Sequence, residues 1–109
     1  MAYDLNLASR MQKLVQTEKG FTAKAMFGGV AYLINGNMAC GVHGDNMIAR
    51  VGPEEYASAI TEPFVTVFDM SGKPMKGWIM VKPEGVSSDA ELRKWVEKGV
   101  KFALTLPAK

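Results

Sequence analysis

The chain has 109 residues, 48% hydrophobic and 22% charged, with a net charge of +2. These values predict one globular domain spanning residues 1–109, and they exclude a disordered chain and a strongly basic nucleic-acid-binding protein. With one cysteine, Cys40, no signal-like N-terminus and no apolar run long enough to cross a membrane, we expect a cytoplasmic protein without internal disulfides.

The first predicted element is an amphipathic helix from Asp4 to Glu18. Asp4 suits the N-cap position, because its carboxylate can accept hydrogen bonds from the first free backbone amides. Alternating apolar residues over 21–27 then predict a strand, which Gly28-Gly29 interrupts. Apolar residues at helical spacing define the buried side of the helix: Leu7, Met11, Leu14 and Val15.

Two turns in the following segment predict the register of three strands. If Asn35-Gly36 and Gly44-Asp45 each form a two-residue turn, Ala31 lies opposite Cys40. Opposed residues share a sheet face, and both turns predict the same wholly apolar face. Its residues are Ala31, Leu33, Met38, Cys40, Val42, Met47, Ala49 and Val51.

The opposite face of this predicted sheet is mixed, and Tyr32, Ala39 and Arg50 form one row across it. Helices are expected to cover only one side of the sheet, so this second face is either a protein interface, such as a homodimer contact, or is covered by the segment 63–82. Its residues are Val30, Tyr32, Ile34, Asn37, Ala39, Gly41, His43, Asn46, Ile48 and Arg50.

The second half of the chain predicts a short helix over 53–60, strands over 64–68 and 78–81, and a last helix that begins at Ser88. Gly99 interrupts the apolar stripe of that helix, which indicates that another element packs closely over it. The predicted order is α-β-β-β-β-α-β-β-α. This order is typical of a two-layer α+β domain with an antiparallel sheet covered on one face by helices.

Four motifs in this order resemble the N-terminal domain family of the TfoX/Sxy competence regulators. They are Met26-Phe27-Gly28-Gly29, Asn35-Gly36-Asn37-Met38, Arg50-Val51-Gly52-Pro53 and Pro74-Met75-Lys76-Gly77-Trp78. The last helix, with Leu92, Trp95, Val96 and Gly99, is similar too.

The resemblance implies a secretion-chaperone-like α+β fold and a bacterial cytoplasmic protein. Longer members of that family carry a C-terminal domain and assist transcription of DNA-uptake genes together with the cyclic-AMP receptor protein. This sequence ends at Lys109, so we expect the second domain to be absent. The resemblance transfers no catalytic residues.

Three small motifs favour structural roles over chemistry. Cys40 and His43 are three residues apart in a predicted strand, which places the thiol in the core and the imidazole outside. The sequence Ser71-Gly72-Lys73 lacks the flanking residues of a phosphate-binding loop. Gly28-Gly29 lacks the spacing of a dinucleotide-binding fingerprint. We therefore predict no metal, no cofactor and no enzyme activity.

The loop before the strand at 78–81 is a second candidate for binding. Lysines flank a methionine beside a large aromatic side chain, a mixture that suits an anionic or stacking partner, although a solvated loop with an inward tryptophan has the same pattern. Lys94, Lys98 and Lys101 on the last helix are typical of a solvated helix face. The candidate binding residues are therefore Tyr32, Ile48, Arg50, Lys73, Met75, Lys76 and Trp78.

The sequence favours a small regulatory or adaptor domain that acts by protein–protein contact, as a homodimer or with a partner that the sequence does not name. Direct nucleic-acid binding through Lys73, Lys76 and the last helix is the alternative, and the small net charge counts against it. A small-molecule site would need a pocket that joins Arg50, His43 and Tyr32.

Overall fold

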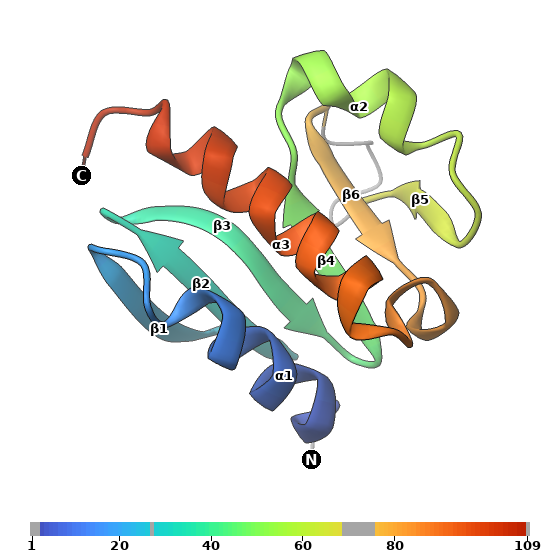
Figure 1. The fold of residues 1–109 in the computed structure, drawn as a ribbon, viewed down its shortest axis with the longest axis horizontal. Coiled ribbons are helices and arrows are strands. Elements are labelled where there is room, and N and C mark those ends of the chain that lie inside the picture. Colours follow the sequence, from blue (N-terminus) through green and yellow to red (C-terminus); the bar gives the residue numbers. More distant parts are fainter. Residues whose placement is uncertain (1–2, 27, 69–75, 109) are drawn as a thin grey trace.

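A computed structural model describes residues 3–26, 28–68 and 76–108, and it shows helices packed on a six-stranded antiparallel sheet (Figure 1). The predicted α+β order is confirmed, with one short 3-10 helix in addition. The elements are α1 (Leu5–Val15), β1 (Phe21–Met26), β2 (Gly29–Ile34), β3 (Asn37–His43), β4 (Asn46–Arg50), α2 (Pro53–Ala59), β5 (Val65–Val67), β6 (Trp78–Val81), the 3-10 helix η1 (Pro83–Val86) and α3 (Asp89–Leu104).

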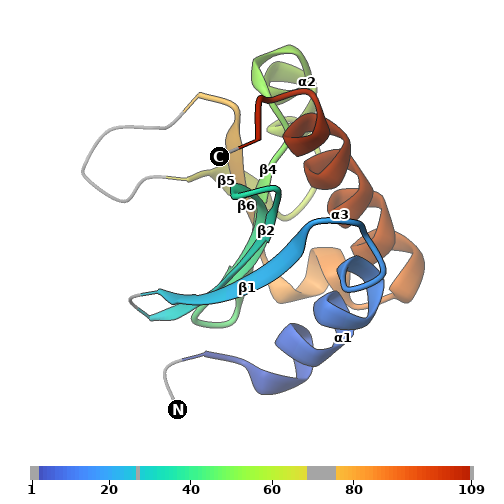
Figure 2. The same cartoon turned by 90° about the vertical axis from the view of Figure 1, so that its left-hand side faces the viewer.

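The sheet has the strand order β1-β2-β3-β4-β6-β5, so β1 and β5 are its edges. Helices α1 and α3 lie side by side on one face of the sheet, and α2 lies beyond the end of β4 (Figure 2). Helix α3 packs on β3 and β4, and the buried residues of these three elements belong to one apolar cluster. We call the side under α1 and α3 the covered face and the other side the helix-free face.

The helix ends follow the predicted capping chemistry. The Asp4 carboxylate accepts hydrogen bonds from the backbone amides of Asn6 at 2.9 Å and Leu7 at 3.1 Å. The Ser88 hydroxyl accepts one from the amide of Glu91 at 3.2 Å. Each cap satisfies amides that the helix itself leaves without an acceptor, which fixes where α1 and α3 begin.

A β-bulge in β3 changes the predicted register. The turn at Asn35-Gly36 forms as expected, with both residues at positive φ, and Leu33 pairs with Met38. The next pair is Tyr32 with Cys40, so Ala39 is an extra residue without a partner in β2. The predicted pairing of Ala31 with Cys40 is therefore wrong. An extra residue in one strand shifts the pairing by one position. Each later residue then pairs with a residue that the unshifted register would place on the opposite face of the sheet.

The bulge reverses the predicted faces of β2. Tyr32 and Ile34 belong to the covered face, where they are 1% and 0% exposed and join the main core cluster. By alternation, Ala31, Leu33 and Met38 belong to the helix-free face, so the prediction that placed these three under the helices is wrong. The prediction is correct for β4, where Met47 and Ala49 are in the core and Arg50 is on the other side.

The bulged residue is also the point at which α3 touches the sheet. A Cβ atom on Gly99 would lie 2.2 Å from the carbonyl oxygen of Ala39. Only glycine allows the helix backbone to approach the strand backbone this closely. The predicted close packing over Gly99 is therefore confirmed, and its partner is the backbone of β3.

Candidate interaction face

The helix-free face of the sheet is partly covered by the chain itself, because buried Phe68, which follows β5, packs against Trp78 at a ring-centroid distance of 6.2 Å. No helix covers the apolar side chains of its strands. They come from β2, β3, β4 and β6, which are adjacent in the sheet. Leu33, Met38, Trp78 and Met80 are half-buried, whereas Ile48 at the centre has no exposed area. A set of half-exposed methionines and aromatics beside a rigid sheet is typical of a surface that adapts to a partner.

The charged side chains of the six strands have one sign. The six strands contain no aspartate or glutamate, and their basic residues are Lys24 in β1 and Arg50 in β4. Exposed Lys76 precedes β6. Positive charge around an apolar surface favours a partner that is itself apolar and acidic, because complementary potentials guide association and penalise unlike partners.

Arg50 is held in place by two aromatic rings. Its guanidinium carbon lies 5.1 Å from the ring centroid of Trp78 and 5.3 Å from that of Phe102. Trp78 is its direct neighbour on β6, whereas Phe102 comes from α3. A cation over the face of an aromatic ring is attracted by the π-electrons, so both contacts stabilise the position of the guanidinium.

The approach of Phe102 to the sheet depends on a glycine. Gly52 has a φ of 90°, and a Cβ atom there would lie 2.4 Å from the Phe102 ring. The Gly52 amide also donates to the carbonyl oxygen of Gly77 at 3.0 Å, next to Trp78. These contacts bring the end of α3 beside Arg50 and fix the geometry of the stack.

Tyr32 is not part of this face. Its hydroxyl donates a hydrogen bond to the carbonyl oxygen of Ala8 in α1 at 2.9 Å, and its ring stacks on Phe21 at a centroid distance of 6.0 Å. Burial is the main cause that raises the pKa of Tyr32 to about 12. The predicted row of Tyr32, Ala39 and Arg50 is therefore wrong, since the bulge at Ala39 places Tyr32 under the helices.

The other candidate binding residues divide into two groups. Ile48, Arg50 and Trp78 lie on the helix-free face, and Lys76 lies just before β6. Lys73 and Met75 lie outside the described residues. The structure thus brings together Arg50 and Trp78, which the sequence placed in two separate candidate sites.

Sequence reasoning missed four residues that the fold adds here, namely Leu33, Met38, Met80 and Phe102. The first two were assigned to the wrong face because a bulge has no reliable sequence signal in an apolar strand. The alternation within β6 could have found Met80, since it lies two residues from Trp78. Phe102 could be identified as part of the site only from the packing of α3 against Gly52.

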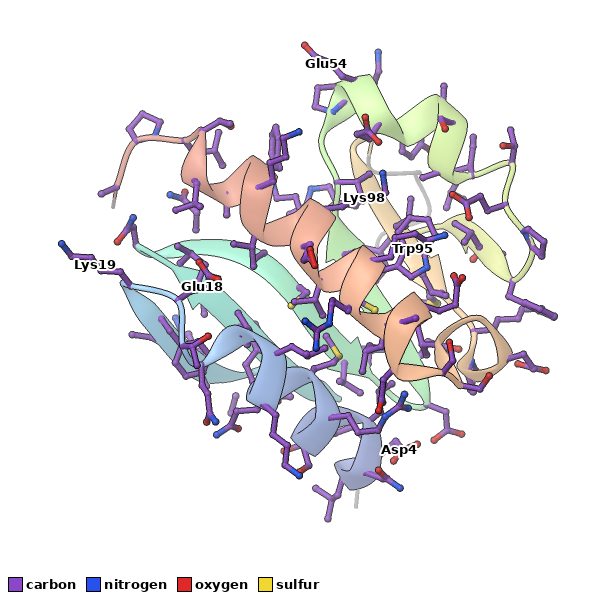
Figure 3. The ribbon with its side chains drawn as sticks, viewed as in Figure 1. Asp4, Glu18, Lys19, Glu54, Trp95 and Lys98 are labelled. Carbon is purple, nitrogen blue, oxygen red and sulfur yellow. The ribbon has the colours of Figure 1, made fainter. Side chains whose placement is uncertain are left out.

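Two lysines of α3, Lys94 and Lys98, form ion pairs with acidic residues. The Lys94 ammonium donates to Glu62 at 2.7 Å and lies 3.2 Å from Glu91, and Lys98 donates to Glu55 at 2.7 Å. Figure 3 shows Lys98 projecting from α3 toward α2. Hydrogen bonding to Glu62 raises the pKa of Lys94, and hydrogen bonding to Lys98 lowers the pKa of Glu55. These pairs partly neutralise the basic side of the helix.

Cys40 and His43 occupy opposite faces, as predicted. Cys40 has no exposed area, and burial raises the pKa of its thiol to about 12. His43 is half-buried on the helix-free face.

Across the described ranges 3–26, 28–68 and 76–108, no three His, Cys, Asp or Glu side chains lie close enough together to hold a metal ion. Within the same ranges no helix has the length and apolar character needed to span a membrane.

A groove of about 370 Å³ lies between the start of α2 and the end of α3. Its lining includes Gly52, Phe102 and the paired Glu55 and Lys98. A small-molecule site would need a pocket that joins Arg50, His43 and Tyr32, and these three residues do not share a face of the sheet, because Tyr32 lies on the covered face.

Comparison with known proteins gives one match. The model of the TfoX N-terminal domain family matches residues 13–103, from the last turn of α1 almost to the end of α3. No curated protein and no solved structure matches the chain.

Proposed function

Because the chain belongs to the TfoX N-terminal domain family, we propose that it is a regulatory domain that acts by binding another protein in the cytoplasm. The observation that carries the proposal is the composition of the helix-free face. Its side chains Leu33, Met38, Trp78 and Met80 are apolar and half-buried, and the strands of the sheet contain no carboxylate. These side chains supply apolar area and positive charge. The proposed role is therefore binding, not catalysis.

The partner that fits this face is a protein segment with apolar anchors and flanking Asp or Glu residues. The anchors would pack on Met38 and Met80, and a carboxylate would accept hydrogen bonds from the edge of the Arg50 guanidinium. A carboxylate and a guanidinium form the strongest common charged hydrogen bond in proteins, and the stacking rings hold Arg50 ready for it.

Peptide selection tests this partner chemistry directly. A random peptide library is selected on the wild-type chain and depleted on a Met38→Glu/Met80→Glu variant. We expect enriched peptides that combine aliphatic or aromatic residues with Asp or Glu, and an Arg50→Glu chain should bind them at least about ten-fold more weakly. Enrichment of basic peptides, or of none, would contradict the proposal. Matched folding of the variants is checked by circular dichroism.

The regulatory part of the proposal follows from the family and has its own test. Transcripts of DNA-uptake genes are measured in a strain that lacks this chain and is complemented with the wild type or with the Met38→Glu/Met80→Glu variant. We expect the wild type to restore a transcript change that the variant does not. A control variant at Ser58, exposed on α2, should behave as the wild type.

Direct nucleic-acid binding is the outcome that would replace this proposal. Lys94 and Lys98 are both engaged in ion pairs, which leaves a small basic surface for phosphate contacts. A gel-shift titration at two salt concentrations separates the two functions, because phosphate contacts weaken steeply as salt rises. A salt-dependent shift by the wild type that the Met38→Glu/Met80→Glu variant retains would favour nucleic acid.

A further inference from the structure

The outer edge of β1 presents backbone groups that no strand of the described residues pairs with. The Asn35 amide donates to the carbonyl oxygen of Gly20 at 3.0 Å, at the end of the β1–β2 ladder. Hydrogen-bonded pairs alternate along an antiparallel ladder, so Thr22 and Lys24 direct their backbone groups toward β2. Phe21, Ala23 and Ala25 direct theirs outward, and the Phe21 amide already donates to Glu18 at 3.2 Å.

The two edges of the sheet differ in how well they are protected. β5 has three residues, whereas β1 has six, contains no proline, and pairs with β2 without a register shift. Residues 22–25 are all exposed, including Ala23 and Ala25. In Figure 2, β1 faces the viewer with no described element in front of it. A long, regular edge of this kind is a template for another strand.

We infer that β1 pairs in antiparallel fashion with β1 of a second copy of the chain, centred on Ala23. The strand is its own complement, because Phe21, Ala23 and Ala25 face one side and Thr22 and Lys24 face the other. With a two-fold axis at Ala23, the Ala23 amide of each copy donates to the Ala23 carbonyl of the other. The Ala25 amide of each copy donates to the Phe21 carbonyl of the other. Apolar residues then meet apolar residues.

Lys24 selects this register over the neighbouring one. Centring the pair on Lys24 would place two ammonium groups directly opposite each other, which destabilises a strand pair. Centring it on Ala23 places each Lys24 opposite Thr22 of the second copy. The pairing extends the sheet and leaves the helix-free face open, so the inference does not rest on the proposed function.

The dimer is expected to be weak and concentration-dependent. One pair of edge strands buries less surface than a stable interface needs, so we expect a dissociation constant on the order of 10–100 μM. Sedimentation equilibrium over a concentration range that brackets this value measures it. A strict monomer up to about 1 mM would overturn the inference.

Mixed cysteine variants test the register. Thr22→Cys and Lys24→Cys chains are prepared separately and oxidised mildly, alone and as an equimolar mixture. In the proposed register residue 22 lies opposite residue 24 of the second copy, in a pair without mutual hydrogen bonds, where the Cα atoms approach to about 4.5 Å. That distance suits a disulfide, so we expect covalent dimers in the mixture alone. Buried Cys40 has no exposed area and adds no background.

Two results of the cysteine experiment would overturn the register. Covalent dimers of Lys24→Cys alone would indicate pairing centred on Lys24. No covalent dimer in any sample at about 100 μM protein, close to the expected dissociation constant, would indicate that β1 does not pair with itself.

Charge substitutions give a second, reversible test. Thr22→Glu introduces a carboxylate opposite Lys24 of the second copy, and Thr22→Lys introduces an ammonium there. With two such pairs per dimer, we expect Thr22→Glu to tighten and Thr22→Lys to weaken the dimer by about 2- to 30-fold each. Thr66→Lys, on the exposed edge strand β5, is the matched control and should leave the dissociation constant unchanged. Equal dissociation constants for all variants, with thermal stability retained, would contradict the pairing.

Discussion

The two faces of the sheet differ in what their side chains contact. On β6, Ile79 points under the helices and has no exposed area, whereas Met80, the next residue, points away from them and is half-buried. The covered face is closed by helix packing and backbone contact. The helix-free face is apolar as well, but its strands carry only positive charge. Burial on the covered face stabilises the fold, while half-buried side chains of the helix-free face keep contact with solvent.

The largest expected effect is the contrast between neighbouring residues of β6. Ile79→Gln leaves a polar amide in the core and should lower the free energy of unfolding by about 4 kcal/mol. Met80→Gln, its matched control, should cost about 1 kcal/mol or less, since its side chain already contacts solvent. Urea denaturation of both variants measures the difference. Equal losses would mean that both faces are core.

Gly99→Ala tests the backbone contact between α3 and β3. Helix propensity alone predicts that alanine stabilises the helix by about 1 kcal/mol. The new Cβ would lie 2.2 Å from the Ala39 carbonyl oxygen, so we expect a loss of about 3 kcal/mol instead. Thermal and urea denaturation give the sign of the change. A stabilised variant would show that α3 can move away from the bulge.

Alkaline pH should lower the free energy of unfolding through Cys40, which lies on the covered face. The folded-state pKa of the thiol is raised from 9.0 to about 12, so the unfolded chain releases this proton first as pH rises. Stability is fully present below pH 9 and falls above it, by about 1.4 kcal/mol per pH unit from this group between pH 9 and 12. Denaturation at several pH values compares the wild type with Cys40→Ala, which should show the smaller slope. Parallel slopes would contradict the buried thiol.

Tyr32→Phe distinguishes the observed register from the predicted one. The variant loses the hydrogen bond to the Ala8 carbonyl oxygen and should be destabilised by about 1 kcal/mol. Tyr56→Phe is the control, because Tyr56 is half-buried at the edge of the core. If both variants were equally stable, Tyr32 would not be anchored under α1.

The smallest expected effect on stability concerns Arg50, on the helix-free face. Arg50→Gln removes both cation–π contacts and should lower stability by about 1 kcal/mol or less. The same variant should lose most of the binding to acidic, apolar peptides. Denaturation and peptide titration are compared on one sample. A large loss of stability with unchanged binding would make Arg50 a structural residue alone.

The sequence predicts much of the fold because local chemistry fixes it. Asp4 and Ser88 provide side-chain oxygens where helices begin, and Asn35-Gly36 adopts the positive φ values of its turn. Gly99 signals close packing, although not its partner. The candidate site is only partly predictable: Arg50 and Trp78 were both identified, but their contact depends on the pairing of β4 with β6.

By itself, the sequence determined the order of the elements, the turns, the helix caps and the covered side of β4, since each follows from a few neighbouring residues. Only the tertiary structure decided which side of β2 faces the helices. Tyr32 and Ile34 alternate with Ala31 and Leu33, so both sides of this strand are apolar and either could form the core. The extra residue Ala39, over which Gly99 of α3 packs, selects one of them. That selection places Tyr32 in the core and leaves Leu33 and Met38 on the helix-free face.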